Sequence, residues 1–282
     1  MAAAPLRPAC GSGEADTGSD RARHAAGNDI AHSVALWALA GVYVAKGNLE
    51  RAERTAREAL ELMESCHFGW LLVVEISLGG ILLYRDQTKE TLSLLTKAAV
   101  NPAQLYSGFS EGLLALGMAA AEMEGATNAC TAAMRFLPRP GTSRSIGAWN
   151  AVLTLTEALC LSGRREEAGR LQAEAEKIAA EWDCNHVGFP VRTAAGIAAA
   201  CAGNWTRAEE HHRALITRME AVPHLTAQPI ARYWYADMLA ERGGAEDVCA
   251  AKAMLSESIA ASDRIGPTLY ARLARQRLAR IA

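Results

Sequence analysis

The chain has 282 residues, of which 50% are hydrophobic and 21% charged, enough to bury the core of one large domain or two small ones. Its 29 Lys and Arg residues nearly balance 31 Asp and Glu residues, which excludes a basic nucleic-acid surface spread over the whole chain. The hydrophobic content also excludes a fully disordered protein. Alanine is abundant and aromatic residues make up only 6%, a composition that favours an all-α fold.

Neither of two candidate segments has the pattern of a secretory signal or a membrane-spanning helix. Residues 1–28 contain prolines, glycines and acids without an apolar stretch, which predicts a disordered leader rather than a secretory signal. The most apolar run, 69–84, is interrupted by Glu75 and is shorter than the ~20 residues that a membrane-spanning helix needs. No membrane contact is therefore expected. The seven cysteines are odd in number and include no C-x-x-C pair, so we expect reduced thiols in a cytoplasmic protein.

Helix-breaking turns recur along the chain at intervals of about 40 residues, each after an apolar helical stretch. This period predicts six helical hairpins. The turns are Gly47-Asn48, Asp86-Gln87, Gly125-Ala126, Gly163-Arg164, Gly203-Asn204 and Gly243-Gly244.

The first hairpin has the clearest pattern. Its first helix is predicted over 30–46, where apolar residues recur at helical spacing, and Gly47 ends it. Its second helix is predicted to end near Ser65 and to bury one apolar face. That face comprises Leu49, Ala52, Ala56, Ala59, Leu60 and Met63.

These residues resemble the tetratricopeptide repeat. The hairpin supplies the residues that the motif requires on both helices and in the turn, namely Leu39-Ala40, Tyr43, Gly47-Asn48, Ala52 and Ala59-Leu60. The other hairpins match less well and are longer than the standard 34 residues. Longer repeats of this kind are similar to the C-terminal helical sensor region of bacterial LuxR-type and cyclase-linked signalling ATPases, over about residues 30–282.

The resemblance implies a TPR-like α-solenoid of about six hairpins with a C-terminal capping helix. Hairpins 1–3 would occupy residues 29–137, and hairpins 4–6 with the cap would occupy 143–282, as one continuous solenoid. First helices line the concave groove of such a stack, which places Trp37, Glu157, Tyr233 and Asp237 there as partner-binding candidates.

The expected function is therefore a scaffold or sensor arm in bacterial signalling or transcriptional regulation. It would bind a partner helix or peptide in an apolar concave groove. A homodimer is left open. Two alternatives also stand, a truncated C-terminal part of a larger signalling ATPase and a small-molecule-sensing helical domain.

The sequence lacks the common motifs of catalysis, nucleotide binding and metal binding. The sequence contains no G-x-x-x-x-G-K-[ST], no G-x-S-x-G and no H-E-x-x-H, so we expect no enzyme and no catalytic, cofactor-binding or metal-binding residues. In the run from Glu209 to His212, neighbouring side chains would point about 100° apart on a helix, which predicts exposed polar residues rather than metal ligands. Four arginines and no acid follow Thr268, as suits a capping helix, and we expect no nucleic-acid partner.

Overall fold

The computed structural model describes residues 17–66, 71–100, 106–139, 145–182, 185–186, 189–222, 224–266 and 268–282. This part of the chain is all-α apart from two paired two-residue strands, which confirms the predicted fold class at that level. The helices are α1 (Thr17–Ala45), α2 (Leu49–Cys66), α3 (Leu71–Tyr84), α4 (Thr88–Ala99), α5 (Phe109–Ala120), α6 (Ala126–Ala133), α7 (Ile146–Leu161), α8 (Arg165–Gly169), α9 (Gln172–Glu181), α10 (Val191–Cys201), α11 (Trp205–Ala221), α12 (Ala227–Arg242), α13 (Ala245–Ile265) and α14 (Leu269–Ile281). A 3-10 turn, Met134–Phe136, follows α6, and β1 (Asn185–His186) pairs antiparallel with β2 (Phe189–Pro190).

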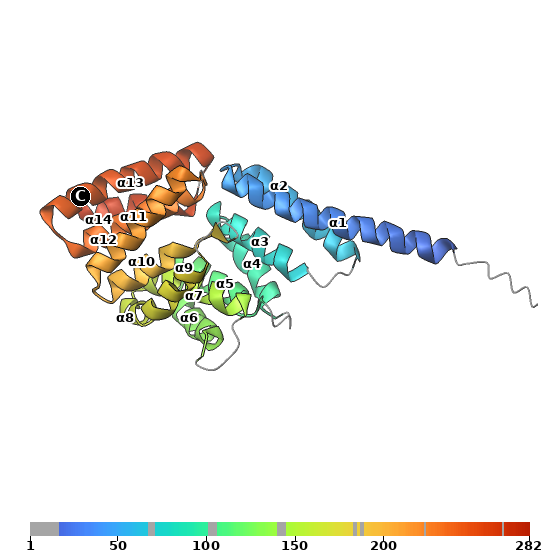
Figure 1. The fold of residues 1–282 in the computed structure, drawn as a ribbon, viewed down its shortest axis with the longest axis horizontal. Helices are drawn as coiled ribbons and strands as arrows, with labels where there is room; N and C mark the ends of the chain where they lie inside the picture. Colours follow the sequence, from blue (N-terminus) through green and yellow to red (C-terminus); the bar gives the residue numbers. More distant parts are fainter. Residues whose placement is uncertain are drawn as a thin grey trace, which may run out of the picture.

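The described helices pack as successive hairpins, each lying against the next (Figure 1). All six predicted turns fall where one helix ends and the next begins, although Ala126 is already the first residue of α6. The fourth hairpin departs from the pattern because α8 and α9 together stand in place of a single second helix.

One residue with a left-handed backbone follows the first helix of every hairpin. Glycine adopts this conformation without the steric cost that a Cβ atom brings, and it fills four of the six positions. In the third turn the left-handed residue is Glu122, not the predicted Gly125, because α5 already ends at Ala120. The six residues are Gly47, Asp86, Glu122, Gly163, Gly203 and Gly243.

The first hairpin matches its prediction closely in α2 and differs in α1. All of the predicted α2 face is buried except Leu60, which is half-buried. Helix α1 begins at Thr17 instead of Ile30, so the part of the expected leader over 17–28 is helical. Alanine and arginine are frequent in this segment, and such good helix formers let an established helix extend toward its N-terminus. The rest of the leader lies outside the described residues.

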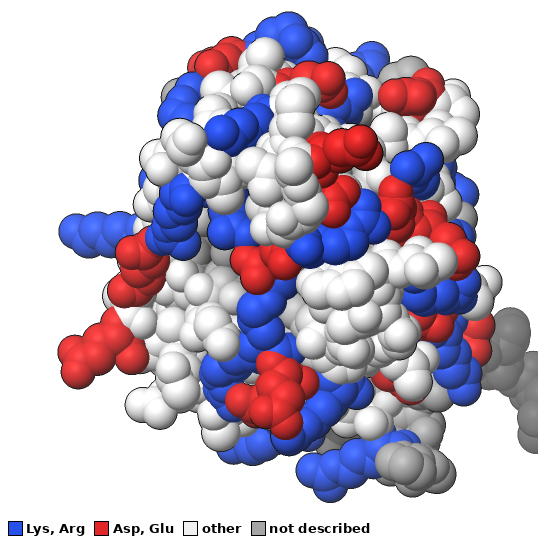
Figure 2. Space-filling model, turned by 90° about the vertical axis from the view of Figure 1, so that its left-hand side faces the viewer, with Lys and Arg blue, Asp and Glu red and all other residues white. Residues whose placement is uncertain are grey.

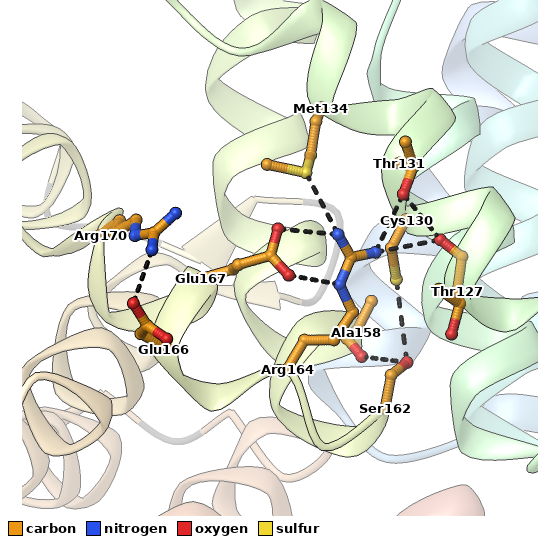
Figure 3. A network of polar contacts seen from close by, with 10 residues as sticks. All are labelled: Thr127, Cys130, Thr131, Met134, Ala158, Ser162, Arg164, Glu166, Glu167 and Arg170. Atoms are coloured by element: carbon orange, nitrogen blue, oxygen red, sulfur yellow. Dashed lines mark hydrogen bonds and ion pairs between the residues drawn. The ribbon is translucent and has the colours of Figure 1, made fainter.

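An arginine joins the third hairpin to the fourth (Figure 3). The Arg164 guanidinium forms two hydrogen bonds with Glu167, at 2.6 and 2.7 Å, at the start of α8. It also donates to the carbonyl of Thr127 at 3.0 Å and to the hydroxyl of Thr131 at 3.1 Å, both on α6. The two predicted groups of hairpins, 29–137 and 143–282, are thus held together here and by the packing of α5 on α7.

The last hairpin also contacts the first. The backbone N–H of Leu225 donates to the carbonyl of Ala45 at 2.7 Å, and the Thr226 hydroxyl donates to the carbonyl of Val44. These contacts satisfy carbonyl groups at the C-terminal end of α1. In Figure 1 the end of α13 accordingly lies beside the turn between α1 and α2.

Helix α14 reaches across to the earlier hairpins. Arg272 donates to both carboxylate oxygens of Asp86, at 2.7 and 2.8 Å, in the turn after α3. It donates as well to the carbonyl of Ala120 at the end of α5, at 3.0 Å. The helix predicted as a terminal cap therefore bridges distant parts of the chain.

The close packing of the segment just before α5 on the start of α7 gives a first testable prediction. A Cβ atom on Gly147 would lie 2.3 Å from the carbonyl oxygen of Ser107 and 2.5 Å from the carbonyl carbon of Tyr106, and neither backbone atom can rotate away. Gly147→Ala should therefore lower the free energy of unfolding by about 2 kcal/mol, as measured by urea denaturation, although alanine normally stabilises a helix. The matched control is Gly41→Ala in α1, where a Cβ atom meets nothing within 4 Å and should stabilise. Equal stability of the two variants would contradict this packing.

Candidate functional site

Three of the four predicted partner-binding residues lie in one cluster. Glu157 comes from α7, and Tyr233 and Asp237 come from α12, one helical turn apart. All three are buried, with Glu157 only 3% exposed. The fourth residue, Trp37, lies on α1 and belongs to a different surface.

Glu157 is a buried carboxyl group held by two aromatic donors. The Trp234 indole N–H donates to its Oε2 atom at 3.1 Å, and the Tyr270 hydroxyl donates to the same oxygen. The Tyr233 ring meets Trp234 and Tyr270 edge-on, with ring centroids 5.0 and 5.7 Å apart. Burial raises the pKa of Glu157 to about 7, although the two hydrogen bonds favour the ionised form.

Asp237 lies between two arginines. Its carboxylate oxygens are 2.9 Å from the Nε atom of Arg277 on α14 and 3.4 Å from Arg165 on α8. Burial raises the pKa of Asp237, and the two guanidinium groups oppose that shift. Arg277 also pairs with Glu241 at 2.5 Å.

A polar pocket of about 350 Å³ lies beside Asp237, between α5, α7, α12 and α14. Six charged side chains of both signs line it, namely Glu122, Arg165, Asp237, Glu241, Arg277 and Arg280. Basic and acidic side chains are likewise interspersed over the surface on the side of the C-terminal helices (Figure 2). This pocket can hold a small polar molecule or a polar side chain, and it differs from the apolar groove that the sequence predicts around Tyr233 and Asp237.

The surface around Trp37 is apolar, as the sequence predicts for the groove. The indole N–H donates to the Ser77 hydroxyl at 2.8 Å, which fixes the ring between two hollows. The larger hollow, about 260 Å³, is lined on the α1 side by Ala38, Ala40, Gly41 and Val44 and on the α3 side by Ser77 and Ile81. The smaller, about 130 Å³, is lined by Val73, Ile76, Ser77, Tyr106, Phe109 and Ile146.

The structure corrects one expectation about His211 and His212. Both imidazoles are buried in α11 rather than exposed. The sequence contains a signal for this, because His212 is four residues after Ala208 and three before Leu215, which are both buried. Among the described residues, no group of three or more His, Cys, Asp or Glu side chains is placed to hold a metal ion.

Other residues of these sites were missed at the level of sequence. Trp234 and Tyr270 contact Glu157, and Arg165 contacts Asp237. These residues come from three different helices, so no short sequence spacing predicts the contacts. The arginines of α14 suit a capping helix in the sequence, but the side chain of Arg277 is only 16% exposed. A helix with charged residues on two sides is ambiguous until its neighbours are known.

No helix in the described part of the chain is both long and apolar enough to cross a bilayer. No protein-family model matches the sequence, and no curated protein matches it either.

Proposed function

We propose that this chain is a helical-repeat scaffold, a TPR-like solenoid of six hairpins, that recognises a helix or peptide of a partner protein. The repeated hairpins with a left-handed residue in each turn support the repeat architecture. Its place in bacterial signalling or transcriptional regulation rests on the resemblance of the repeats alone.

The observation that carries the proposal is the pair of apolar hollows around Trp37. Each is large enough for an apolar side chain, and both share Trp37 and Ser77 as a common wall. Two neighbouring apolar pockets suit two anchors one helical turn apart on a partner helix. Small residues, Ala38 and Gly41, leave room for the partner backbone to approach α1.

The exposed face of α1 extends this surface. Leu39 is 39% exposed and Val42 is 46% exposed, next to Ala35 and Ala38, which are also exposed. Helical spacing places these side chains on a stripe that begins at the edge of the larger hollow. Large exposed apolar side chains in a continuous patch are typical of an interaction surface.

Filling the larger hollow should abolish binding without disturbing the core. Gly41→Phe places a ring in the hollow, where a Cβ atom at residue 41 meets nothing within 4 Å. Helical peptides selected from a display library against the wild-type chain should lose at least about tenfold in affinity for this variant, as measured by fluorescence anisotropy. Trp37→Ala should weaken the binding of the same peptides.

The matched control is Gly27→Phe, at another exposed position of α1 where a Cβ atom also meets nothing within 4 Å. This variant should bind like the wild type. If the selected peptides bind Gly41→Phe with unchanged affinity, the groove is not the recognition site.

The polar pocket supports a second candidate function, the sensing of a small molecule. Paired charges of both signs around about 350 Å³ suit a zwitterionic or polar ligand better than a peptide helix. In a screen of charged metabolites, at least one compound should then raise the thermal midpoint of the wild type. Arg277→Met should remove that shift while leaving peptide binding at Trp37 intact.

A further inference from the structure

Two cysteines from different hairpins meet beside the polar pocket. Cys160 lies one residue before the end of α7, and Cys201 is the last residue of α10. Their sulfur atoms are 3.9 Å apart, and each belongs to a helix that packs against the other. Cys160 is buried and Cys201 is half-buried.

A disulfide bond needs the sulfurs at about 2.05 Å, so they must approach by roughly 1.9 Å. Rotation of the two side chains about their Cα–Cβ bonds can supply a movement of this size. The partners come from the C-terminal ends of adjacent helices, where the backbone is less constrained than in a helix centre.

The surroundings favour reaction at Cys201 first. The hydrogen bond between the two thiols lowers the pKa of Cys201 and raises the pKa of Cys160. Arg165, whose Nη1 atom lies 3.3 Å from the Cys160 sulfur, further favours a thiolate in the pair. The more accessible thiol is thus also the one that ionises more readily.

We propose that Cys160 and Cys201 form a reversible disulfide by exchange with a low-molecular-weight disulfide. The Cys201 thiolate attacks one sulfur of the small disulfide, which releases one small thiolate and leaves a mixed disulfide on Cys201. Cys160 then loses its proton and attacks the Cys201 sulfur, which releases the second small thiolate. The two protein thiols are oxidised, the small disulfide is reduced to two thiols, and the two protons from the protein end on those thiols.

The bond would change the polar pocket as well as the helix packing. Cys160 lines that pocket, and Arg165 is shared between the Cys160 sulfur and Asp237. Oxidation removes the Cys160 thiol as a partner of Arg165, so that Asp237 remains as its partner in the pocket. It also joins α7 to α10 covalently, which restricts the unfolded chain and should raise the thermal midpoint. This inference does not depend on the groove at Trp37.

The experiment treats the full chain with oxidised glutathione, alkylates free thiols, and maps tryptic peptides without reduction. Peptide 145–164, which carries Cys160, should be found linked to peptide 193–207, which carries Cys201, and dithiothreitol should separate them. Alkylation of both residues in the wild type, under conditions in which the exposed Cys249 has formed a mixed disulfide, would overturn the proposal. This wild-type result requires no variant to fold.

Three variants separate the steps. Cys160→Ser should accumulate a stable mixed disulfide on Cys201, because the resolving thiol is gone. Cys201→Ser should leave Cys160 reduced, since it is buried. Cys249→Ser should form the linked peptide like the wild type. A link from Cys201 to any other cysteine in place of Cys160 would also contradict the assignment.

Discussion

Lowering the pH from 7 to 4 should reduce the free energy of unfolding by about 3 kcal/mol through His212 alone. Burial, followed by repulsion from His211, lowers the pKa of His212 from 6.5 to about 3. In the unfolded chain the same imidazole takes up a proton near pH 6.5. The stabilising contribution is therefore fully present above pH 6.5 and is lost as the pH falls through 3, by about 5 kcal/mol in total.

The surroundings of His212 explain why it stays neutral. Its ring is 1% exposed and stacks on Tyr235, with centroids 5.5 Å apart and planes 9° from parallel. A Cβ atom at Gly196 would lie 2.7 Å from the ring, so α10 and α11 approach closely here. Neither ring nitrogen has a hydrogen-bond partner among the described residues. A charge in this place would be desolvated without compensation.

His212→Phe keeps a flat ring and removes the proton site. Urea denaturation of the wild type and this variant at a series of pH values should show the wild type losing about 3 kcal/mol more between pH 7 and 4. Comparison with the wild type cancels the carboxylates that titrate in the same range. His32→Phe, at an exposed position of α1, is the control and should keep the wild-type pH dependence. Parallel curves for wild type and His212→Phe would show that His212 protonates freely in the folded state.

Glu157 should produce the opposite pH dependence, of about 3 kcal/mol. Its pKa is raised from 4.5 to about 7 by burial. The folded state thus holds a proton that the unfolded chain releases near pH 4.5. The stabilising contribution is fully present below pH 4.5 and is lost as the pH rises through 7.

Glu157→Gln should therefore be more stable than the wild type at pH 8, by about 3 kcal/mol, and similar to it at pH 4. Both Trp234 and Tyr270 donate to a single carboxylate oxygen, and the amide oxygen of glutamine can accept from both. Urea denaturation at the two pH values measures the difference.

The control for this measurement is Glu166→Gln. Glu166 forms an exposed ion pair with Arg170, and such pairs contribute little to stability. The two proteins should therefore differ by less than about 0.5 kcal/mol at either pH. If Glu157→Gln is destabilised equally at pH 4 and pH 8, the buried carboxyl group carries no cost from its negative charge at pH 8, and the prediction is wrong.

The sequence predicts those features of this fold that are set by neighbours along the chain. Gly47 and Gly203 mark turns because glycine tolerates a left-handed backbone, and the buried face of α2 follows from apolar residues at helical spacing. The third turn is predicted three residues too late, at Gly125, because a non-glycine residue, Glu122, carries the left-handed conformation there. The turn at Asp86, another non-glycine residue with a left-handed backbone, is nevertheless predicted at its correct position.

The candidate sites depend on contacts between distant helices and are predicted less well. Trp37 lies beside an apolar hollow on α1, a helix whose residues belong to the hairpin with the clearest sequence pattern. Glu157 becomes a buried acid only because Trp234 and Tyr270 arrive from α12 and α14. Cys160 and Cys201 are separated by 41 positions, and their meeting depends on how α7 packs against α10.

The contacts of Leu225 and Thr226 with the end of α1 tie the last hairpin to the first. In an open repeat array a unit can be gained or lost at either end, since each unit contacts only its neighbours. Here an additional hairpin would displace Thr226 from Val44, and a missing one would leave Arg272 out of reach of Asp86. Duplication of a single repeat would therefore cost these contacts between distant hairpins. Its unfolding should accordingly proceed as one cooperative transition instead of from one end.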